Sequence, residues 1–383
     1  MFSVGIFHNI LWAKYKGGVF SALSKVASEQ GVPVFFVQIA ETESDRVGLS
    51  NVDMSYHCYQ HKLMFKGAYD NVPTWRLISS LTIEVLKSSA DLIVLPGYHR
   101  PEYWAMLFAC IVKRKKRAVF CDSTIFDRPS GLLKILAKRF FFRLCDGYFG
   151  YGLRSRAYLL SLGAKQDRIF HRCQAAALPH DYSPAIALEN RIKNVTQLSS
   201  ARFLYAGRIS WEKGLGSLLS AFKLVLNELP DSRLVLVGSG PLRAELEGQC
   251  HSLGIFEKVE FTGGMPIENL AIEYAKATCF VLPSTSEPWG LVVNEALSYG
   301  CPVVVSNVCG CVPELVRTGV TGFDFEVGDA RGLADCMLKV ATEFVDHELV
   351  AKRCIELISH YSPERAAQQI LDGSAAILKE QLV

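Results

Sequence analysis

The sequence predicts an α/β protein with two doubly wound, Rossmann-like domains that face each other across a cleft. Three observations support this prediction. Short runs of β-branched and aromatic residues recur, and an amphipathic segment of helical length follows each run. The runs are almost continuously apolar, which is typical of strands buried on both faces of a parallel sheet. Between residues 178 and 201 the alternation fails and polar residues gather, so the chain divides there into two halves.

Ten runs predict strands, five in each half of the chain. Those of the first half are SVGIF (3–7), VPVFFV (32–37), DLIVLP (91–96), AVFCD (118–122) and GYFGYG (147–152). Those of the second half are RFLYAG (202–207), RLVLVG (233–238), KVEFTG (258–263), TCFVLP (278–283) and CPVVVS (301–306). Because strands alternate with helices, right-handed βαβ crossovers are the expected connections.

The predicted domains are residues 1–183 and residues 200–358. Near the C-terminus, Ser362, Pro363 and Glu364 have the order of an N-cap followed by the first two helical residues. We therefore expect a helix over about 362–383, and its position after the second domain allows it to return to the first.

The composition describes an ordered globular chain, with 383 residues of which 50% are apolar and 21% are charged. It excludes a disordered protein and a collagen-like repeat. Residues 1–183 contain 24 Lys and Arg against 14 Asp and Glu, whereas residues 184–383 contain 17 against 24. This asymmetry indicates that the first half meets an anionic partner.

Three further features concern the location of the protein. The twelve cysteines are scattered without a CxxC pair, so we expect reduced thiols and no metal site. No stretch of 18 uncharged apolar residues predicts a spanning helix. The N-terminal segment has no basic region before its apolar run, so we do not expect a signal peptide. Together these features predict a cytoplasmic protein.

The most informative segment covers residues 283–302 and reads PSTSEPWGLVVNEALSYGCP. A predicted strand ends at its start, and a helix begins after Gly290, which lets the backbone approach a ligand closely. The amides of Gly290, Leu291 and Val292 then present free N–H groups, and such a helix start favours phosphate.

Two carboxylates belong to the same segment. Glu295 lies about one turn into the helix, where it can accept hydrogen bonds from a ribose diol, and Glu287 precedes the helix, where it can hold sugar hydroxyls. By themselves, two glutamates at this spacing favour a solvated surface over a ligand site. The surrounding pattern PSxSEPWGLVxxEAxxxGxPVV, however, closely resembles glycosyltransferase family 4, a group of retaining sugar transferases with the GT-B fold.

A second stretch, YAGRISWEKG (205–214), resembles the GRLxxxKG element of this family. The resemblance assigns the donor pyrophosphate to Arg208 and Lys213 and includes Gly207 in the donor site. The chemistry agrees, because two fixed cations stabilise the charge that a leaving nucleoside diphosphate gains.

The resemblance is strong over about 200–345 and weaker elsewhere, and the chain departs from the family pattern at particular positions. Cys311 replaces the second glycine of a GGxPE element. The Gly238-Ser239-Gly240 turn gives only a weak indication of dinucleotide binding, because Arg243 stands where the third glycine of GxGxxG belongs.

In the first half, Lys16, Gly17 and Gly18 open a predicted helix, and the family places a Gly-Gly here against the donor diphosphate and the transferred sugar. The family's preceding proline is missing, and a plain helix start remains an alternative. Asp122 follows the AVFCD strand at the edge where α/β ligands bind, so it is a candidate for orienting the sugar or the acceptor hydroxyl. A helix N-cap near Ser123 or Asp127 is the alternative.

Basic residues concentrate in residues 113–117 (KRKKR) and 132–144 (LLKILAKRFFFRL). Basic charge mixed with Phe and Leu suits an interfacial helix on anionic lipid, although a solvated face over a core face gives the same pattern. The family's lipid-linked acceptors favour a peripheral membrane enzyme on the inner face of the cytoplasmic membrane. The sequence shows no stacking platform or groove-reading motif for nucleic acid.

The resemblance implies a retaining glycosyltransferase that moves a hexose from a nucleotide-diphosphate sugar, with UDP or GDP, to a hydroxyl of a glycan or lipid-linked glycan. It implies a role in cell-surface polysaccharide synthesis, such as lipopolysaccharide or exopolysaccharide, with no cofactor and no essential divalent metal. The catalytic candidates are Arg208, Lys213, Glu287 and Asp122. A nucleotide-sugar epimerase or a phosphorylase of the same fold remains an alternative, as does a non-catalytic glycan-binding module.

Overall fold

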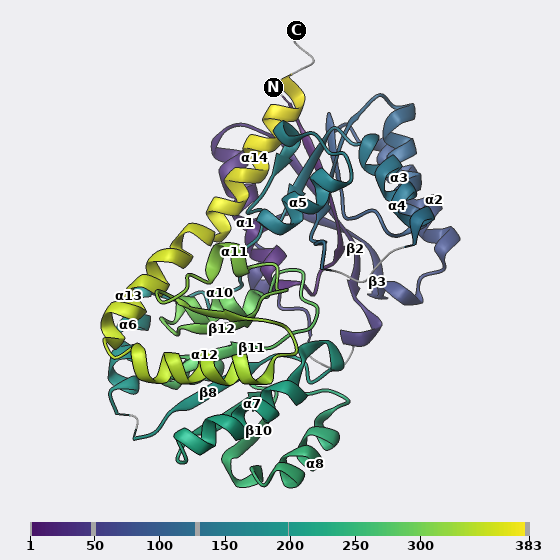
Figure 1. Cartoon of the computed structure of the whole chain (residues 1–383). Helices are drawn as coiled ribbons and strands as arrows, with labels where there is room; N and C mark the ends of the chain where they lie inside the picture. The colour runs from purple at the N-terminus through teal and green to yellow at the C-terminus, as the bar shows by residue number, and fades with distance from the viewer. Residues whose placement is uncertain (1, 47–50, 127–130, 198, 380–383) are drawn as a thin grey trace. The chain divides into compact units, whose positions relative to one another are not determined.

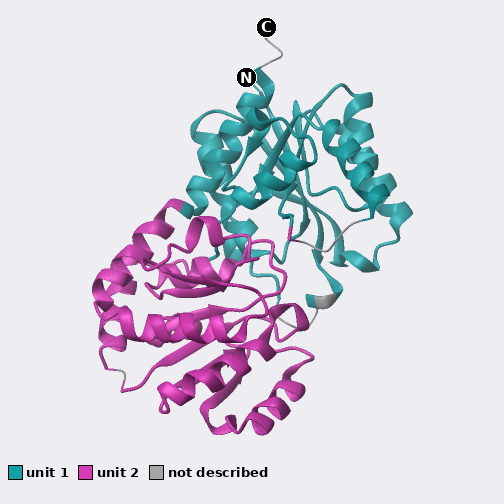
Figure 2. Ribbon diagram, in the orientation of Figure 1, with its two compact units in different colours: residues 1–125, 129–177, 361–383 teal, residues 126–128, 178–360 magenta. Residues whose placement is uncertain are grey.

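The computed structural model describes residues 2–46, 51–126, 131–197 and 199–379. The chain divides into two compact units (Figure 2). The first contains residues 1–125, 129–177 and 361–383, and the second contains residues 126–128 and 178–360. Both units alternate strands and helices along the chain, as expected from the sequence (Figure 1).

The first unit is built on a parallel sheet. Its strands are β1 (Val4–Ile10), β2 (Val34–Thr42), β3 (His61–Ala68), β4 (Leu92–Leu95), β5 (Lys116–Cys121), β6 (Gly147–Gly150) and β7 (Ile169–Phe170). Within the described residues they form a seven-stranded sheet in the order β3-β2-β1-β4-β5-β6-β7. Every neighbouring pair is parallel.

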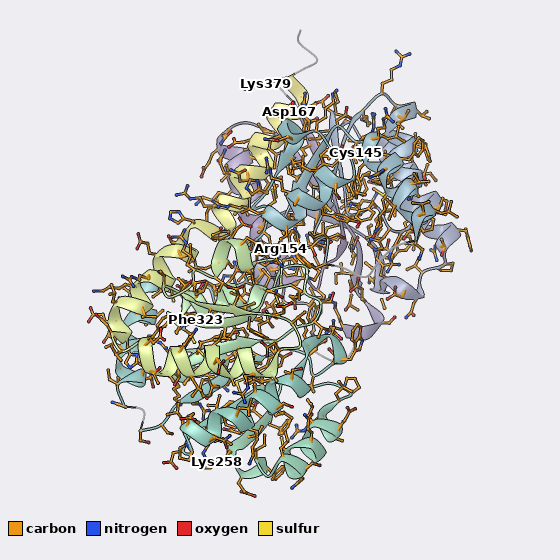
Figure 3. All side chains as sticks on the ribbon, viewed as in Figure 1. Cys145, Arg154, Asp167, Lys258, Phe323 and Lys379 are labelled. Atoms are coloured by element: carbon orange, nitrogen blue, oxygen red, sulfur yellow. The ribbon has the colours of Figure 1, made fainter. Side chains whose placement is uncertain are left out.

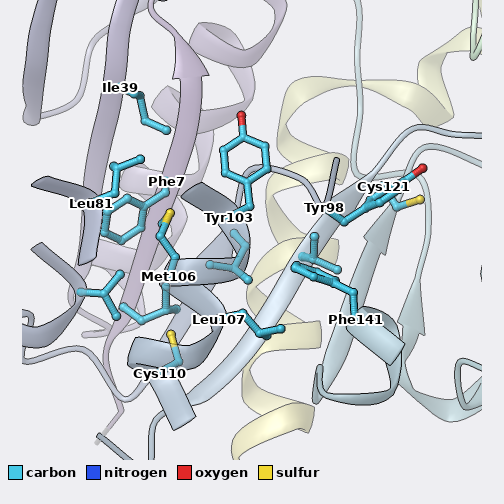
Figure 4. Close-up of a cluster of buried hydrophobic side chains, with 14 of the residues drawn as sticks. Phe7, Ile39, Leu81, Tyr98, Tyr103, Met106, Leu107, Cys110, Cys121 and Phe141 are labelled. Carbon is cyan, nitrogen blue, oxygen red and sulfur yellow. The ribbon is translucent and has the colours of Figure 1, made fainter. Parts of the chain in front are cut away.

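Helices cover both faces of this sheet because successive strand residues point to opposite sides. Leu92 and Val94 of β4 face α1 (Lys14–Glu29) and α14 (Pro363–Lys379). Ile93 and Leu95 belong to the opposite core, shown in Figure 4. The helices on that side are α2 (Thr74–Lys87), α3 (Pro101–Val112), α4 (Leu132–Arg143) and α5 (Leu153–Ser161). Burial on both faces explains why the strands are almost continuously apolar.

The C-terminal helix α14 belongs to the first unit, so the predicted return of the chain is confirmed. It packs against α1. Ile377 of α14 covers β6 at Gly147, where an added Cβ would come within 2.2 Å of the Ile377 side chain. A side chain at Gly147 would therefore force the Ile377 side chain to move.

The second unit repeats this design. Its strands are β8 (Arg202–Ala206), β9 (Arg233–Val237), β10 (Val259–Gly263), β11 (Cys279–Leu282), β12 (Val303–Ser306) and β13 (Gly322–Phe325). They form a parallel sheet in the order β10-β9-β8-β11-β12-β13. The helices are α6 (Pro184–Val195), α7 (Leu215–Glu228), α8 (Arg243–Leu253), α9 (Ile267–Lys276), α10 (Leu291–Ser298), α11 (Val312–Leu315), α12 (Ala330–Glu343) and α13 (His347–Ile358). The predicted pair of doubly wound Rossmann-like domains is confirmed.

The structure differs from the prediction between residues 178 and 201, where we expected an irregular break. Helix α6 occupies most of this segment, and its buried residues Ala187, Arg191 and Val195 recur every four positions. The guanidinium of Arg191 donates hydrogen bonds to carbonyls at the end of α9, including those of Tyr274 and Ala275, each at 3.2 Å. Because a charged residue occupies a core-facing position, the helical periodicity is hidden in the sequence.

Three strands also lie outside the predicted runs. Strand β3 is a half-exposed edge strand in which apolar and polar residues mix, so it lacks the continuous apolar character of the others. Strand β7 is only two residues long, and β13 is interrupted by the exposed Asp324. All twelve cysteines are free thiols, in agreement with the sequence. No helix in the described part of the chain is long and apolar enough to span a membrane.

Candidate active site

The strand order of each sheet reverses beside its first strand, and ligands of open α/β sheets bind at this switch point, outside the carboxyl ends of the strands. In the second unit, the switch point lies between β8 and β11, which pair in parallel. The loop after β8 carries Arg208 and Lys213, and the loop after β11 carries Glu287. Three of the predicted site residues therefore follow the two strands at the switch point.

The structure brings Lys213 and Glu287 into direct contact. The Nζ atom of Lys213 lies 2.5 Å from Oε2 of Glu287, and each side chain is 16% exposed. A short ion pair that keeps some access to solvent can exchange its partners for those of a ligand. The site thus holds a cation that can bind an anionic group and a carboxylate that can accept a hydrogen bond from a hydroxyl group.

The two loops are fixed to each other through their backbones. The amide of Thr285 donates to the carbonyl of Glu212 at 2.8 Å. Gly214 has a positive φ of 65°, and a Cβ there would lie 2.1 Å from the carbonyl oxygen of Pro283. Only glycine allows this approach, so the final residue of the GRLxxxKG-like element holds Lys213 beside the β11 loop.

A second close backbone contact joins the ends of β8 and β9. Gly207 donates its amide to the carbonyl of Val237 at 3.0 Å. Gly238 has a φ of 138°, and a Cβ there would lie 1.8 Å from the carbonyl oxygen of Gly207. A Cβ at Gly240 would lie 2.1 Å from the carbonyl oxygen of Ile209. The glycines of this turn are therefore explained by backbone packing.

Arg208 also lies in the loop after β8. Its side chain is 55% exposed, and Nη2 lies 3.5 Å from Oε1 of Glu212. Its carbonyl accepts a hydrogen bond from the hydroxyl of Tyr205 at 2.6 Å, which fixes the backbone. The Cα position of Arg208 is therefore set by the strand end.

Helix α10 begins at Leu291, directly after Gly290, as the sequence predicts. Gly290 has a φ of 99°, which favours glycine. The first amides of a helix, here those of Leu291 and Val292, have no acceptor within the helix. The helix start therefore provides N–H donors and a partial positive charge close in sequence to Glu287.

The loop before α10 is held by a neighbouring turn. Gly310 donates its amide to the carbonyl of Glu287 at 2.9 Å, and Cys311 donates to the carbonyl of Trp289 at 3.1 Å. A Cβ at Gly310 would lie 1.7 Å from the carbonyl oxygen of Pro288. Cys311 itself is buried, so the residue that replaces the family's second glycine packs inside the unit.

Glu295 has a partner that the sequence did not reveal. The hydroxyl of Tyr274, on α9, donates to Oε2 of Glu295 at 3.0 Å. Burial raises the pKa of Glu295 from its ordinary value to about 7. Tyr274 lies in an unremarkable helical segment of the sequence, and no motif marks it as a neighbour of this carboxylate.

In the first unit, the predicted residues lie on different elements at the same edge of the sheet. Asp122 follows β5 directly, and its side chain is exposed. Gly17 lies in the first turns of α1, where a Cβ would lie 2.8 Å from the imidazole of His57. A Cβ at Gly18 would lie 4.0 Å from Pro363 of α14. Close packing against its own unit thus accounts for Gly17.

The helix-capping alternative is wrong for Ser123. Helix α4 begins only at Leu132, after Gly131, and the Ser123 hydroxyl lies 2.7 Å from the hydroxyl of Tyr98. Asp127, the other candidate cap, lies outside the described residues.

A buried cation lies at the same edge of the sheet, and no sequence motif marks it. Lys16 is 2% exposed, and its Nζ atom has no hydrogen-bond acceptor among the described residues. The ammonium lies 4.5 Å from the ring centroid of Phe120 and 4.8 Å from that of Tyr151, which is cation–π geometry. Burial lowers the pKa of Lys16 to about 8. A lysine in the first turn of a helix is expected to be solvated, so nothing in the sequence marks it as buried.

The same buried region lowers the pKa of His8. Its own burial is the larger cause and the charge of Lys16 the smaller one, and together they lower the pKa of His8 to about 3.

No group of three or more His, Cys, Asp or Glu that could hold a metal ion is found within the described ranges.

Comparison with known proteins places the similarity in the second unit. Residues 188–350 match the family model for glycosyl transferases group 1. The chain is 35% identical over 182 residues to the sulfoquinovosyl transferase SQD2 of Arabidopsis thaliana, covering 45% of this chain and 33% of that protein. It is 38% identical over 125 residues to the alpha-monoglucosyldiacylglycerol synthase of Streptococcus pneumoniae, covering 32% and 28%. These alignments span about a third of the relatives' own length.

The fold has a solved counterpart over the whole chain. The crystal structure of Anabaena HepE in complex with UDP and glucose aligns with a TM-score of 0.72 and 18% identity, covering 98% of this chain and 100% of that one. At this identity, the likeness establishes the GT-B type of fold for both units.

Proposed function

We propose that this protein is a retaining glycosyltransferase that moves a hexose from a UDP- or GDP-sugar to a hydroxyl of a glycan or lipid-linked glycan. The observation that carries the proposal is the Lys213–Glu287 ion pair at the switch point of the second sheet. It lies within the segment that matches glycosyl transferases group 1.

In the proposed mechanism, the second unit stabilises the leaving nucleoside diphosphate. Lys213 exchanges Glu287 for a phosphate oxygen of the donor, and the amides of Leu291 and Val292 meet the same diphosphate. Their charges are fixed before the reaction, so they stabilise the negative charge that develops as the glycosidic bond breaks. Arg208, whose guanidinium is exposed, can turn to the diphosphate while its backbone stays in place.

The carboxylates orient the donor. Once Lys213 binds phosphate, Glu287 is able to accept hydrogen bonds from hydroxyls of the transferred sugar and fix its position for attack. Glu295 accepts from the ribose hydroxyls, with Tyr274 as a second donor that orients its carboxylate. Neither carboxylate acts as a glycosidase-type nucleophile. The leaving β-phosphate instead helps to deprotonate the incoming hydroxyl on the same face of the sugar, so the anomeric configuration is kept.

The first unit provides the acceptor side in this proposal. Asp122, at the carboxyl end of β5, orients the acceptor hydroxyl or the sugar, and Gly18, where an added Cβ would meet only Pro363 at 4.0 Å, lets the backbone approach the donor. A lipid-linked acceptor and an anionic membrane surface fit the basic first half of the chain, and the similarity to a diacylglycerol glycolipid synthase supports this choice. The enzyme then works on the inner face of the cytoplasmic membrane in cell-surface polysaccharide synthesis.

A donor panel tests this function. The full chain is incubated with UDP- and GDP-sugars and with glycan or glycolipid acceptors, and free nucleoside diphosphate is measured. We expect acceptor-dependent release with one donor, an elongated acceptor whose new linkage has the anomeric configuration of the donor by NMR, and unchanged turnover in EDTA.

The rival activities leave different products. An isomerised donor without elongation identifies an epimerase, and a sugar phosphate formed with inorganic phosphate identifies a phosphorylase. Acceptor binding without release of nucleotide under any donor identifies a glycan-binding module. Each of these results overturns the proposal.

A further inference from the structure

Helix α4 exposes apolar side chains on the face that points away from its own core. The exposed fractions are 75% for Leu132, 82% for Leu133, 51% for Leu136 and 53% for Phe140. The opposite face carries Phe141 and Phe142, which are fully buried against the sheet. A group of exposed apolar side chains of this kind marks a binding surface, because burying them against another apolar surface removes them from water.

Helix α3 extends this surface. Its Trp104 stacks on Phe140 of α4 with ring centroids 6.3 Å apart, so the two helices lie side by side, as Figure 1 shows. At the end of α3, Phe108 is 46% exposed and Val112 is 75% exposed. We call the exposed residues of the two helices the apolar face; they are Phe108, Val112, Leu132, Leu133, Leu136 and Phe140.

A basic pocket lies at the ends of the same two helices. It has a volume of about 320 Å³ and is lined by charged residues of both signs, together with Cys145, which is labelled in Figure 3. The charged residues are Lys116, Arg117, Arg143, Lys165, Arg168 and Asp146. Five cations and one carboxylate give the pocket a large positive excess, which favours an anion.

The single carboxylate of the pocket is already engaged. Oδ1 of Asp146 lies 3.2 Å from Nζ of Lys116, and Oδ2 lies 3.5 Å from Nη1 of Arg117. Arg143 and Lys165 have no ion pair with any of the described residues. These two cations are therefore the groups that an incoming anion would meet.

Helix geometry connects the pocket to the apolar face. Leu136, Phe140 and Arg143 are spaced by four and three residues, so they follow one another along one side of α4. At the end of α3, Lys116 follows Val112 after a short basic turn. A molecule with a phosphate in the pocket and an apolar tail would therefore lie along the apolar face.

The positive charge of this region decides between the possible binding partners. Residues 103–121 and 128–145 contain no Asp or Glu, and the cations Lys113, Arg114, Lys134 and Arg139 belong to the same two segments of the chain. A second copy of this chain on a two-fold axis would bring these cations together. A free phosphate would leave the apolar face uncovered. A bilayer with anionic headgroups satisfies both the charge and the apolar surface.

We propose that the apolar face of α3 and α4, together with the basic pocket, is a docking surface for a bilayer containing anionic phospholipid, with a headgroup phosphate bound between Arg143 and Lys165. This surface gives a location to the membrane contact in the proposed function. Its test measures no sugar transfer, so the two proposals fail separately.

The test is flotation of the full chain with vesicles of phosphatidylcholine alone or mixed with phosphatidylglycerol. We expect binding to the mixed vesicles only, and about a tenfold or larger loss of partitioning for the double variant Arg143→Glu, Lys165→Glu. The matched control is Lys25→Glu, Lys66→Glu, two exposed lysines of the same unit with the same change in net charge, which keeps wild-type binding. Leu133→Ser, Leu136→Ser removes only exposed side chains and also loses binding.

Three results would overturn the proposal. Equal binding to neutral vesicles removes the role of the anion. An equal loss in the lysine control reduces the effect to net charge. Stabilisation of the wild type by inorganic phosphate, without vesicle binding, assigns the pocket to a soluble anion. Circular dichroism of each variant confirms that the fold is kept.

Discussion

The two units have the same strand order around their first strand, but the long motifs that the sequence reveals belong to the second, whereas the first offers only the Gly-Gly at Gly17 and Gly18. In the second unit, the site depends on glycines at which another backbone comes within van der Waals contact, such as Gly214 and Gly238. In the first unit, the corresponding edge of the sheet holds buried polar side chains such as Lys16 and His8, whose burial the sequence does not reveal. Close backbone contacts demand glycine and leave a pattern; a buried side chain leaves none.

This difference has a chemical counterpart in the proposed function. A nucleoside diphosphate offers the same phosphates to every enzyme that uses it, so a fixed set of cations and amides suffices for the second unit. Acceptors differ, and the first unit adjusts to them with side chains on separate elements. The following predictions test this division, from the largest expected effect to the smallest.

The largest expected effect is the loss of turnover when the residues of the Lys213–Glu287 pair are replaced. Lys213→Ala removes a cation that meets the leaving diphosphate, so we expect kcat to fall about 10²–10³-fold. Glu287→Ala is expected to lose most of its turnover as well. Asp122→Ala should act mainly through KM for the acceptor, with a smaller effect on kcat. Steady-state kinetics with both substrates varied measures all three.

Lys223→Ala is the matched control for Lys213→Ala, because Lys223 is an exposed lysine of the adjoining helix α7. We expect wild-type kinetics from it. If Lys213→Ala and Glu287→Ala also transfer sugar at the wild-type rate while folded, the second unit is not where the donor reacts.

The next effect concerns stability. Gly238→Ala forces a Cβ to within 1.8 Å of the Gly207 carbonyl oxygen, so we expect a loss of more than about 3 kcal/mol of unfolding free energy. Gly248→Ala on α8 meets nothing within 4 Å and should instead stabilise by up to about 1 kcal/mol. Urea unfolding compares the two, and equal stabilities would show that the β8–β9 contact tolerates a side chain.

In the first unit, Lys16 predicts a pH dependence of stability. Its pKa is lowered from 10.5 to about 8, so between these values the unfolded state binds more protons and stability rises with pH. The gain is at most about 3 kcal/mol, at about 1.4 kcal/mol per pKa unit. Lys16→Met should remove it.

The measurement for Lys16 is the difference in unfolding free energy between the wild type and Lys16→Met at pH 7 and pH 9.5, which cancels the titration of other groups. A difference that does not change with pH would mean that Lys16 is not buried as a cation.

The raised pKa of Glu295 predicts a smaller pH dependence of stability, with the opposite sign to that of Lys16. Because its pKa is raised from 4.5 to about 7, the folded state holds the proton longer, and stability falls as pH rises between these values. We expect about 2 kcal/mol, since the side chain keeps some exposure. Glu295→Gln should flatten the profile, and thermal unfolding between pH 5 and pH 7.5 tests this. A profile that the substitution leaves unchanged would contradict the assignment.

The sequence predicted the fold class and all elements whose apolar pattern is regular. It missed α6 because Arg191 occupies a core-facing position, and β3 because an edge strand mixes polar and apolar residues. It singled out Arg208, Lys213, Glu287 and Gly290 because their motif is local, and these residues follow strands β8 and β11 in the structure. It missed Tyr274 and the burial of Lys16, since both depend on side chains that meet only after the chain has folded.

The most direct test of the donor site is a crystal structure of the full chain with the nucleoside diphosphate that the donor panel selects. We predict the diphosphate within hydrogen-bond distance of the Lys213 ammonium and of the Leu291 and Val292 amides, with the ribose hydroxyls at Glu295. A nucleotide bound elsewhere, with Lys213 still paired to Glu287, would contradict the account.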